Sequence, residues 1–366
     1  MKRLIVCCDG TWQNLAQKTP TNIAQIAMHA ANRSPADGVE QIVYYDSGVG
    51  ATFDADDSNF LNGIGDAATR FLGGAIGDGV EKKIFDAYRF LACNYVEGDE
   101  IFVFGFSRGA FTARSLCGLI YASGLVDRRH LDKIDEAYDL YRDGGVKPDD
   151  KAAIEFRKAH GPVRPIRYLG CFDTVGMNGV PDLLDWIALD KVINRSHGFH
   201  DLKLNHTIRK ARHACAIDED RNAFPLTRMQ PSDRAAADQV QEMWFPGYHG
   251  GVGGGESEGR PFADSALLWV ADGAREAGLA VNDTLLEATN PKPDAKMIRP
   301  KGLRRLGDRK RALTPPYDEV LLHQSVRRRW LKVASWRPDT LKPLSAALDA
   351  QAERFRVASG ETDPDG

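Results

Sequence analysis

The amino-acid sequence predicts an α/β fold, with a mostly parallel β-sheet, helices on both of its faces and a helical cap insertion. Three observations lead to this prediction. Five apolar runs, rich in β-branched or aromatic residues, are typical of strands buried on both faces, and segments with helical periodicity separate them. In addition, 43% of the 366 residues are hydrophobic, which is enough to bury a large core. We therefore expect a single domain over residues 1–366.

The predicted elements alternate between strand and helix along most of the chain. A helix is expected from Asn22, a capping residue with Gln25 three positions later. Another is expected over residues 79–95, where apolar residues recur at helical spacing, and more helix between residues 110 and 160. The predicted strands are, in chain order, residues 3–9, 41–46, 100–106, 166–173 and 240–247.

Two segments depart from this alternation. Residues 177–235 form a long mixed stretch, which we expect to lie as a cap insertion over the carboxyl ends of the strands. Residues 290–320 form a proline-rich, basic excursion. Its stretch RPKGLRRLGDRKR, residues 299–311, is expected to be a solvated loop rather than a docking patch for phosphates, because proline and glycine residues interrupt it.

Polar residues follow the predicted strands. The chemistry of a parallel sheet gathers at the carboxyl ends of its strands, which lie together at one edge. We therefore expect a site where these strand-end residues meet. They are Asp9-Gly10-Thr11, Asp46-Ser47-Gly48, Ser107 and Asp173-Thr174, with His249 following the last strand.

The pentapeptide at residues 105–109, GFSRG, fits the G-x-S-x-G pattern, in which small residues let a sharp strand-to-helix turn expose the serine hydroxyl. An apolar strand directly precedes it and a helix-compatible run follows it, as this turn requires. Ser107 is therefore the candidate nucleophile. The alternative is a serine that only caps the following helix.

A serine nucleophile needs a base to take its proton and an acid to orient that base, and in α/β-hydrolases both follow the serine in the chain. Asp173 closes a predicted strand and is the candidate acid. His249, in a glycine-rich loop after the last strand, is the candidate base. The alternative acids are Asp218 and Asp264, which no clean apolar strand precedes. The alternative bases are His206, His213 and His323.

The tetrahedral intermediate of such a reaction needs two N–H donors for its oxyanion. One is expected from Arg108, the residue after the candidate nucleophile. The other is expected from Gly10 or Thr11, in the loop after the first strand. The side chain of Asp9 either takes a direct part in the site or braces this loop by hydrogen bonds.

Charge and cysteine content argue against several classes of protein. A net charge of −3 and a pI near 6.3 give no general attraction for nucleic acid or an anionic membrane. The six cysteines form no CxxC pair and no metal or nucleotide motif is complete, so we expect neither a metal nor a cofactor. The sequence has no signal-peptide core and no apolar run of transmembrane length, so a cytoplasmic protein is expected, with export by a dedicated secretion system left open.

Six blocks of the sequence resemble, in this order, the signature blocks of a known family. They are RLIVCCDGTWQN, YYDSGVG, AYRFLACNYVEGDEIFVFGFSRGAFTARSL, CFDTVG, WFPGYHGGVGGG and LLHQSVRRRWLKVASWRPDTL. The chain thereby resembles the DUF2235 family of α/β-hydrolase domains, which includes the catalytic domain of Tle1-type phospholipase effectors of type VI secretion. The resemblance implies an α/β-hydrolase-like fold and a Ser-Asp-His hydrolase acting on esters, with Ser107, Asp173 and His249 in those roles.

The chain departs from the family pattern after the histidine. Family members commonly have Ser-Asp there, whereas this chain has Gly250 and Gly251. An aspartate that orients the histidine or shapes the pocket would thus be missing, with altered substrate choice or activity as the consequence. We expect a hydrolase of carboxylic esters whose substrate is a small-molecule ester or a lipid. The alternatives are a phospholipase effector acting on membrane lipids and a hydrolase-fold protein that binds without turnover.

Overall fold

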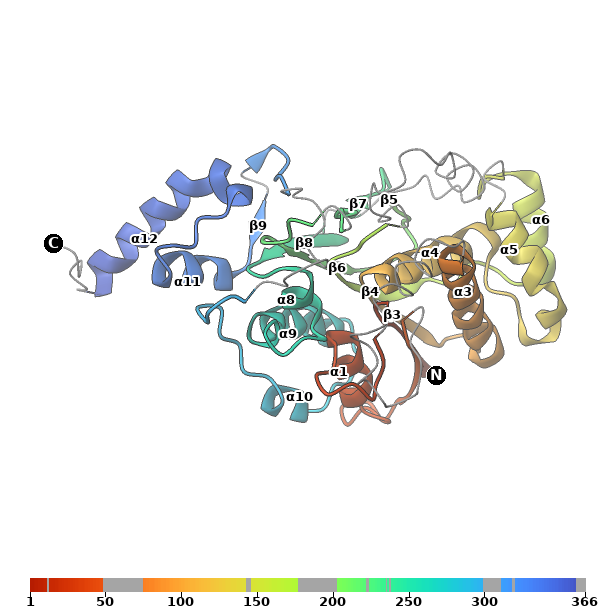
Figure 1. Cartoon of the computed structure of the whole chain (residues 1–366). Helices are drawn as coiled ribbons and strands as arrows, with labels where there is room; N and C mark the ends of the chain where they lie inside the picture. The colour runs from red at the N-terminus through yellow and green to blue at the C-terminus, as the bar shows by residue number, and fades with distance from the viewer. Residues whose placement is uncertain are drawn as a thin grey trace.

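The computed structural model of the chain describes residues 1–11, 13–48, 75–142, 146–176, 203–221, 224–234, 236, 238–298, 311–317 and 320–359. Within this part of the chain, a seven-stranded sheet with helices on both faces forms the centre of the molecule (Figure 1). The fold is α/β-hydrolase-like, as the sequence predicts. A separate small sheet joins β5 (Lys203–Leu204) to β7 (Gln230–Pro231).

The main sheet has the strand order β2-β1-β3-β4-β6-β8-β9, and every neighbouring pair is parallel. The chain starts at β1, adds β2 on one side, and adds β3 and the later strands on the other side. The direction of winding thus reverses between β1 and β3, and open parallel sheets bind ligands beside such a reversal, at the carboxyl ends of the strands. The strands are β1 (Lys2–Cys8), β2 (Glu40–Asp46), β3 (Glu100–Phe106), β4 (Ile166–Phe172), β6 (Ala211–Ala216), β8 (Val240–Phe245) and β9 (Leu321–Leu322).

Alternate residues of the central strands enter two separate hydrophobic cores, because successive side chains of a strand point to opposite faces. In β1, Leu4 and Val6 enter the first core, whereas Ile5 and Cys7 enter the second. Figure 1 shows the helices of the two cores on different sides of the sheet. Those of the first are α3 (Ala75–Asn94), α4 (Arg108–Ser123), α5 (Ile134–Arg142) and α6 (Lys151–His160), and those of the second are α1 (Asn22–His29), α8 (His249–Gly253), α9 (Arg260–Glu276) and α10 (Thr284–Glu287).

The C-terminal part of the chain builds a third core at the β9 edge of the sheet. It contains α11 (Gln324–Lys332), a 3-10 helix (Asp339–Leu344) and α12 (Ser345–Ser359). Trp330 and Trp336 pack there with Trp244 of β8. Figure 1 shows this part, in blue, beside β8 and β9. None of the helices in the described ranges is both long enough and apolar enough to cross a bilayer.

The sheet contains two strands that the sequence pattern did not predict. β6 lies within residues 177–235, the range predicted as a cap insertion, but it is an inner strand of the main sheet. Its apolar pattern is interrupted by Arg212, whose side chain reaches Glu276 of α9, and by the buried His213. β9 is only two residues long. Residues 177–202 of the predicted cap lie outside the described residues.

The start of α1 also differs from the prediction. Thr21, and not Asn22, caps this helix, and its Oγ1 accepts a hydrogen bond from the backbone N–H of Ala24 at 3.0 Å. The Asn22 side chain is buried and donates instead to the carbonyl oxygens of Val252 and Ala263. In the excursion predicted at residues 290–320, residues 299–310 lie outside the described ranges.

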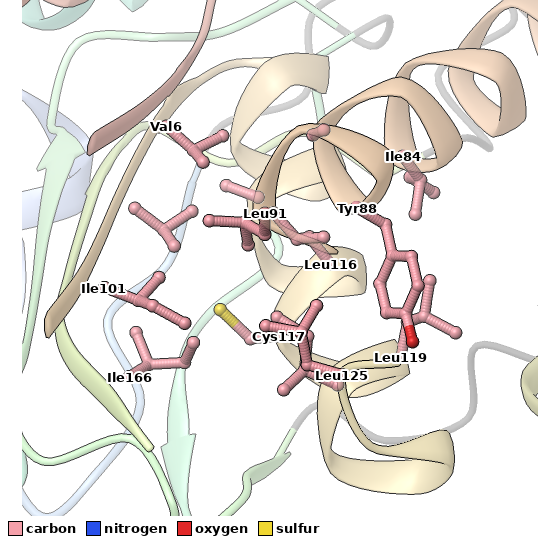
Figure 2. Close-up of a cluster of buried hydrophobic side chains, with 14 of the residues drawn as sticks. Val6, Ile84, Tyr88, Leu91, Ile101, Leu116, Cys117, Leu119, Leu125 and Ile166 are labelled. Atoms are coloured by element: carbon pink, nitrogen blue, oxygen red, sulfur yellow. The ribbon is translucent and has the colours of Figure 1, made fainter. Parts of the chain in front are cut away.

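We expect Leu116→Ala to lower the free energy of unfolding by about 2–5 kcal/mol, because it leaves a cavity that the surrounding core fills only partly. Leu116 of α4 is fully buried in the first core, beside Leu91 and Cys117 in Figure 2. Urea unfolding measures this change. Leu286→Ala on α10 is the matched control, because Leu286 is 52% exposed and its loss is expected to change stability little. Equal effects of the two substitutions would contradict the described core.

Candidate active site

Ser107 lies on a sharp turn between β3 and α4. Its backbone has φ 58° and ψ −125°, a conformation that L-residues rarely adopt. Among the described residues, Asp173 is the only other non-glycine residue with positive φ. Strained backbone of this kind costs about 1–3 kcal/mol per residue and is frequent at functional sites. The sequence predicted such a turn at Ser107, but not at Asp173.

The two glycines of the pattern allow close backbone contacts at this turn. A Cβ atom on Gly109 would lie 2.2 Å from the carbonyl oxygen of Cys8, at the end of β1. A Cβ atom on Gly105 would lie 2.5 Å from Cα of Ala110. The start of α4 thus packs directly on the backbone of β1, which places Ser107 next to the loop that follows β1.

The side chains of Ser107, His249 and Asp173 form a continuous hydrogen-bonded series. His249 Nε2 lies 2.8 Å from Ser107 Oγ, and His249 Nδ1 lies 2.6 Å from Asp173 Oδ2. Because a carboxylate only accepts hydrogen bonds, Nδ1 carries the proton, and the unprotonated Nε2 accepts a hydrogen bond from the Ser107 hydroxyl. The Ser107 side chain makes no capping hydrogen bond to α4.

His249 is held from several sides. It is the first residue of α8, and its backbone N–H donates to Glu219 Oε2 at 3.0 Å. The rings of Phe106 and Phe224 lie with their centroids 4.7 Å and 4.6 Å from that of the imidazole. Only 7% of His249 is exposed, so its ring has little freedom to turn.

Asp173 is fully buried and hydrogen-bonded at both carboxylate oxygens. Oδ1 accepts from the backbone N–H of Ala216 at 2.9 Å and from Arg311 Nη1 at 2.5 Å, and Oδ2 accepts from Arg311 Nη2 at 2.9 Å. Burial alone would raise the pKa of Asp173, but the charge of Arg311 and the hydrogen bonds from His249 and Arg311 hold this pKa well below its usual range. The carboxylate is therefore ionised at neutral pH.

Arg311 and Glu219 are parts of this site that the sequence analysis missed. Arg311 was expected in a solvated loop, and this expectation is wrong: 9% of the residue is exposed and its guanidinium binds Asp173. No local sequence pattern identifies Arg311, because its partner Asp173 lies 138 positions earlier in the chain. Glu219 follows β6, the strand that the pattern did not reveal.

The other candidate acids and bases have partners of their own. His213 Nε2 accepts from the backbone N–H of Thr174 at 3.1 Å, and its Nδ1 lies 2.9 Å from Glu242. His323 caps α11, and burial lowers its pKa to about 4. His206, Asp218 and Asp264 contact Tyr121, Trp336 and Arg260, respectively.

Gly10 and Thr11, the candidate oxyanion donors in the loop after β1, make different hydrogen bonds. The N–H of Gly10 donates to its neighbour Asp9 at 2.7 Å, so it is already engaged. Thr11 Oγ1 accepts from Nε of Arg108, which connects this loop to the start of α4. The backbone N–H of Arg108 lies in the first turn of α4, directly after Ser107.

Asp9 ties this loop to two other elements. Besides Gly10, its carboxylate accepts from Thr21 Oγ1 and from Tyr45 Oη, both at 2.6 Å. Burial raises its pKa to about 6, although the three hydrogen bonds oppose this change. These hydrogen bonds brace the loop against α1 and β2.

The glycines after His249 have different surroundings. A Cβ atom on Gly250 would lie 3.0 Å from the carboxyl carbon of Glu256, so a serine there requires that side chain to shift. A Cβ atom on Gly251 would make only ordinary contacts, the nearest at 3.8 Å. Since Asp173 already binds the His249 ring, the ring orientation in this chain does not depend on an acid at position 251.

One cluster in the described ranges has residue types that bind metals. Ligand atoms of His213, Cys215 and Glu242 lie within 4.8 Å of one another. However, Glu242 already accepts from His213 and from Arg228 Nε at 2.5 Å, and burial raises the pKa of the Cys215 thiol well above its usual range. Internal hydrogen bonds thus account for this cluster, and we assign no metal to it.

Comparison with known proteins identifies the family. Residues 2–273 match the family model of the type VI secretion system phospholipase effector Tle1-like catalytic domain. The chain belongs to this family. The family is described as like the phospholipase effector Tle1, so it is a family of lipase-type hydrolases. The match includes the described elements from β1 to most of α9.

The individual proteins that this chain is similar to share less than a third of their aligned residues with it. An uncharacterized protein of Saccharomyces cerevisiae is 29% identical over 241 residues, which are 61% of this chain and 32% of the yeast protein. An uncharacterized protein of Pseudomonas aeruginosa has a TM-score of 0.43 at 16% identity, with 93% of this chain and 52% of the other covered. The chain thus spans about half or less of the length of these first relatives.

Two further solved structures are similar to parts of the chain. The Tle1 effector bound to the VgrG spike of the type VI secretion system has a TM-score of 0.35 at 19% identity, over 69% of this chain and 50% of that one. Esterase 2 of Thermogutta terrifontis has a TM-score of 0.34 at 14% identity, over 76% of this chain and 85% of the esterase.

We expect Asp9→Asn to change how stability depends on pH. The folded state raises the pKa of Asp9 from 3.8 to about 6 and so favours the protonated form. This contribution is complete below the unfolded pKa and is lost as pH rises through the folded pKa. The free energy of unfolding of the wild type, relative to Asp9→Asn, is therefore expected to fall by up to about 3 kcal/mol between about pH 4 and pH 8. Urea unfolding across this range measures the difference, and a constant difference would contradict the expectation.

Proposed function

We propose that the protein is a serine hydrolase that cleaves carboxylic esters through an acyl-enzyme. The observation that carries this proposal is the hydrogen-bonded series from Ser107 Oγ through His249 to Asp173, with distances of 2.8 Å and 2.6 Å. These contacts lie within the range that a general base needs to reach its nucleophile and its orienting acid. The family, which is described as like the phospholipase effector Tle1, supports ester hydrolysis as the reaction class.

In the first half of the reaction, Ser107 Oγ attacks the acyl carbon while its proton moves to His249 Nε2. The ionised Asp173 keeps the proton on Nδ1 and stabilises the imidazolium that forms. When the tetrahedral intermediate collapses, the bond to the alkoxy oxygen breaks and His249 gives its proton to the leaving alcohol. In the second half, water attacks the acyl-serine, His249 takes a proton from this water, and Ser107 Oγ leaves with that proton.

The oxyanion of both tetrahedral intermediates needs preorganised donors. We assign one to the backbone N–H of Arg108 and the other to the backbone N–H of Thr11, in the loop joined to Arg108. The N–H of Gly10 is a poorer candidate, because it already donates to Asp9. In this assignment, Asp9 holds the loop in place and does not contact substrate.

We expect Ser107→Ala to abolish covalent labelling by a fluorophosphonate probe and to lower kcat for p-nitrophenyl butyrate by about 10⁴-fold or more. The reason is that, in the part of the chain that the structure describes, Ser107 supplies the hydroxyl that lies against His249 Nε2, at 2.8 Å. Ser123→Ala is the matched control, because Ser123 is a buried serine at the far end of α4, the helix that follows Ser107, and its hydroxyl donates to the Ala137 carbonyl oxygen. The control is expected to keep labelling. Labelling that survives Ser107→Ala would overturn the assignment.

A phospholipase is the second candidate function, and the family match favours it. Vesicles of phosphatidylcholine and phosphatidylglycerol separate the two candidates when fatty-acid release is measured beside p-nitrophenyl butyrate hydrolysis. If small soluble esters are the substrates, the wild type is expected to hydrolyse the butyrate and release about as little fatty acid as Ser107→Ala. Ser107-dependent release of fatty acid at a comparable rate would instead establish the phospholipase.

A further inference from the structure

We infer that Arg311 is a positioning residue of the proposed Ser107–His249–Asp173 site. In this role it fixes the orientation of the Asp173 carboxylate and makes the Asp173–His249 pair harder to protonate. The inference rests on the proposed function. It adds a residue that neither the sequence pattern nor the family match contains, since the Tle1-like match ends at residue 273.

The hydrogen bonds of the Arg311 guanidinium fix its orientation. Two parallel N–H groups bind the two oxygens of Asp173, at 2.5 Å and 2.9 Å. The same two nitrogens also donate to the carbonyl oxygens of Ala216 and Phe224, at 2.9 Å and 3.1 Å. Four hydrogen bonds therefore hold a planar group whose donors are themselves rigidly placed.

The consequence for Asp173 is that each oxygen has two donors. Oδ1 accepts from Ala216 and Arg311, and Oδ2 accepts from His249 and Arg311. Rotation of the carboxylate would break several charge-assisted hydrogen bonds together. Since Oδ2 is the atom that binds His249 Nδ1, Arg311 also determines where the imidazole ring is directed.

Arg311 also determines the charge of the site. Other titratable groups around the Asp173–His249 pair are Glu219, which accepts from the His249 backbone, Arg221, which binds both oxygens of Glu219, and the Cys215 thiol on β6. Glu219 and Arg221 form an ion pair with each other, so their charges largely cancel. Among the described residues, Arg311 is thus the arginine whose charge directly offsets that of Asp173.

Replacing Arg311 with a neutral residue is therefore expected to change the pH dependence of catalysis in one direction. Without the adjacent cation, the buried Asp173–His249 pair accepts a proton more readily, whichever of the two residues holds it. A protonated pair cannot take the proton of Ser107. The acidic limb of the kcat/KM profile consequently moves to higher pH, and kcat falls because the carboxylate is no longer fixed.

The test compares wild type, Arg311→Gln and Arg311→Lys in the hydrolysis of p-nitrophenyl butyrate from about pH 5 to pH 9. For Arg311→Gln we expect kcat to fall by about 10–100-fold with little change in KM, and the acidic limb to rise by about one pH unit or more. Arg311→Lys keeps the charge but not the two-pronged contact. It is therefore expected to keep the acidic limb near that of wild type while kcat falls.

Arg329→Gln is the matched control for general loss of stability. Arg329 is a buried arginine of α11 whose guanidinium donates to the carbonyl oxygens of Pro293 and Ala295, and it does not contact the site. This variant is expected to lower Tm without moving the acidic limb. Thermal unfolding of all variants shows which of them are folded in the assay.

The outcomes separate this inference from the proposed function. If wild-type turnover is not lost in Ser107→Ala, both fail. If turnover depends on Ser107 but folded Arg311→Gln keeps the wild-type kcat and acidic limb, only the role of Arg311 is overturned. Should Arg311→Gln not fold, Arg311→Lys decides: a lower kcat with an unmoved limb supports the role, and a wild-type kcat overturns it.

Discussion

A buried carboxylate that has to keep its charge is the constraint on which this site depends. Asp173 is fully removed from water, and an unpaired charge in that position costs several kcal/mol. Its donors come from separate parts of the chain: the end of β6, the start of α8 and Arg311. Satisfying one carboxylate thus brings together elements that the sequence places far apart, and the same contacts put the His249 ring against Ser107.

The two residues with strained backbone, Ser107 and Asp173, are connected through the His249 ring. Ser107 and Asp173 both have positive φ, and neither is a glycine. Each conformation is unfavourable in isolation and persists only where the surroundings enforce it. For Ser107, the enforcing contact is the packing of Gly109 on the carbonyls of β1. For Asp173, it is the set of hydrogen bonds at the carboxylate and the backbone N–H that donates to Ala214 at 2.8 Å.

The sequence was sufficient for the parts of the site that follow recognisable strands. Ser107, Asp173 and His249 could be proposed together because each comes after an apolar run, and the structure does bring these three side chains into contact. β6 escaped notice because Arg212 and His213 are polar residues that find partners only in the folded sheet. Arg311 could not be predicted for a related reason. An arginine in a basic stretch has the same sequence neighbours whether its side chain is in solvent or forms a buried ion pair with a distant residue.

The position of Arg311 in the chain has a consequence for the order in which the protein is built. Synthesis proceeds from the N-terminus, and domains begin to fold as they emerge. The sheet as far as β8, with Ser107, Asp173 and His249, is complete in sequence before Arg311 is made. Trp336 and Thr340, which bind Asp218 and the carbonyl of Ile217, come later still. The nascent chain therefore carries Ser107, Asp173 and His249 for some time without the cation that offsets the charge of Asp173, and the full set of contacts around Asp173 forms only when Arg311 is in place.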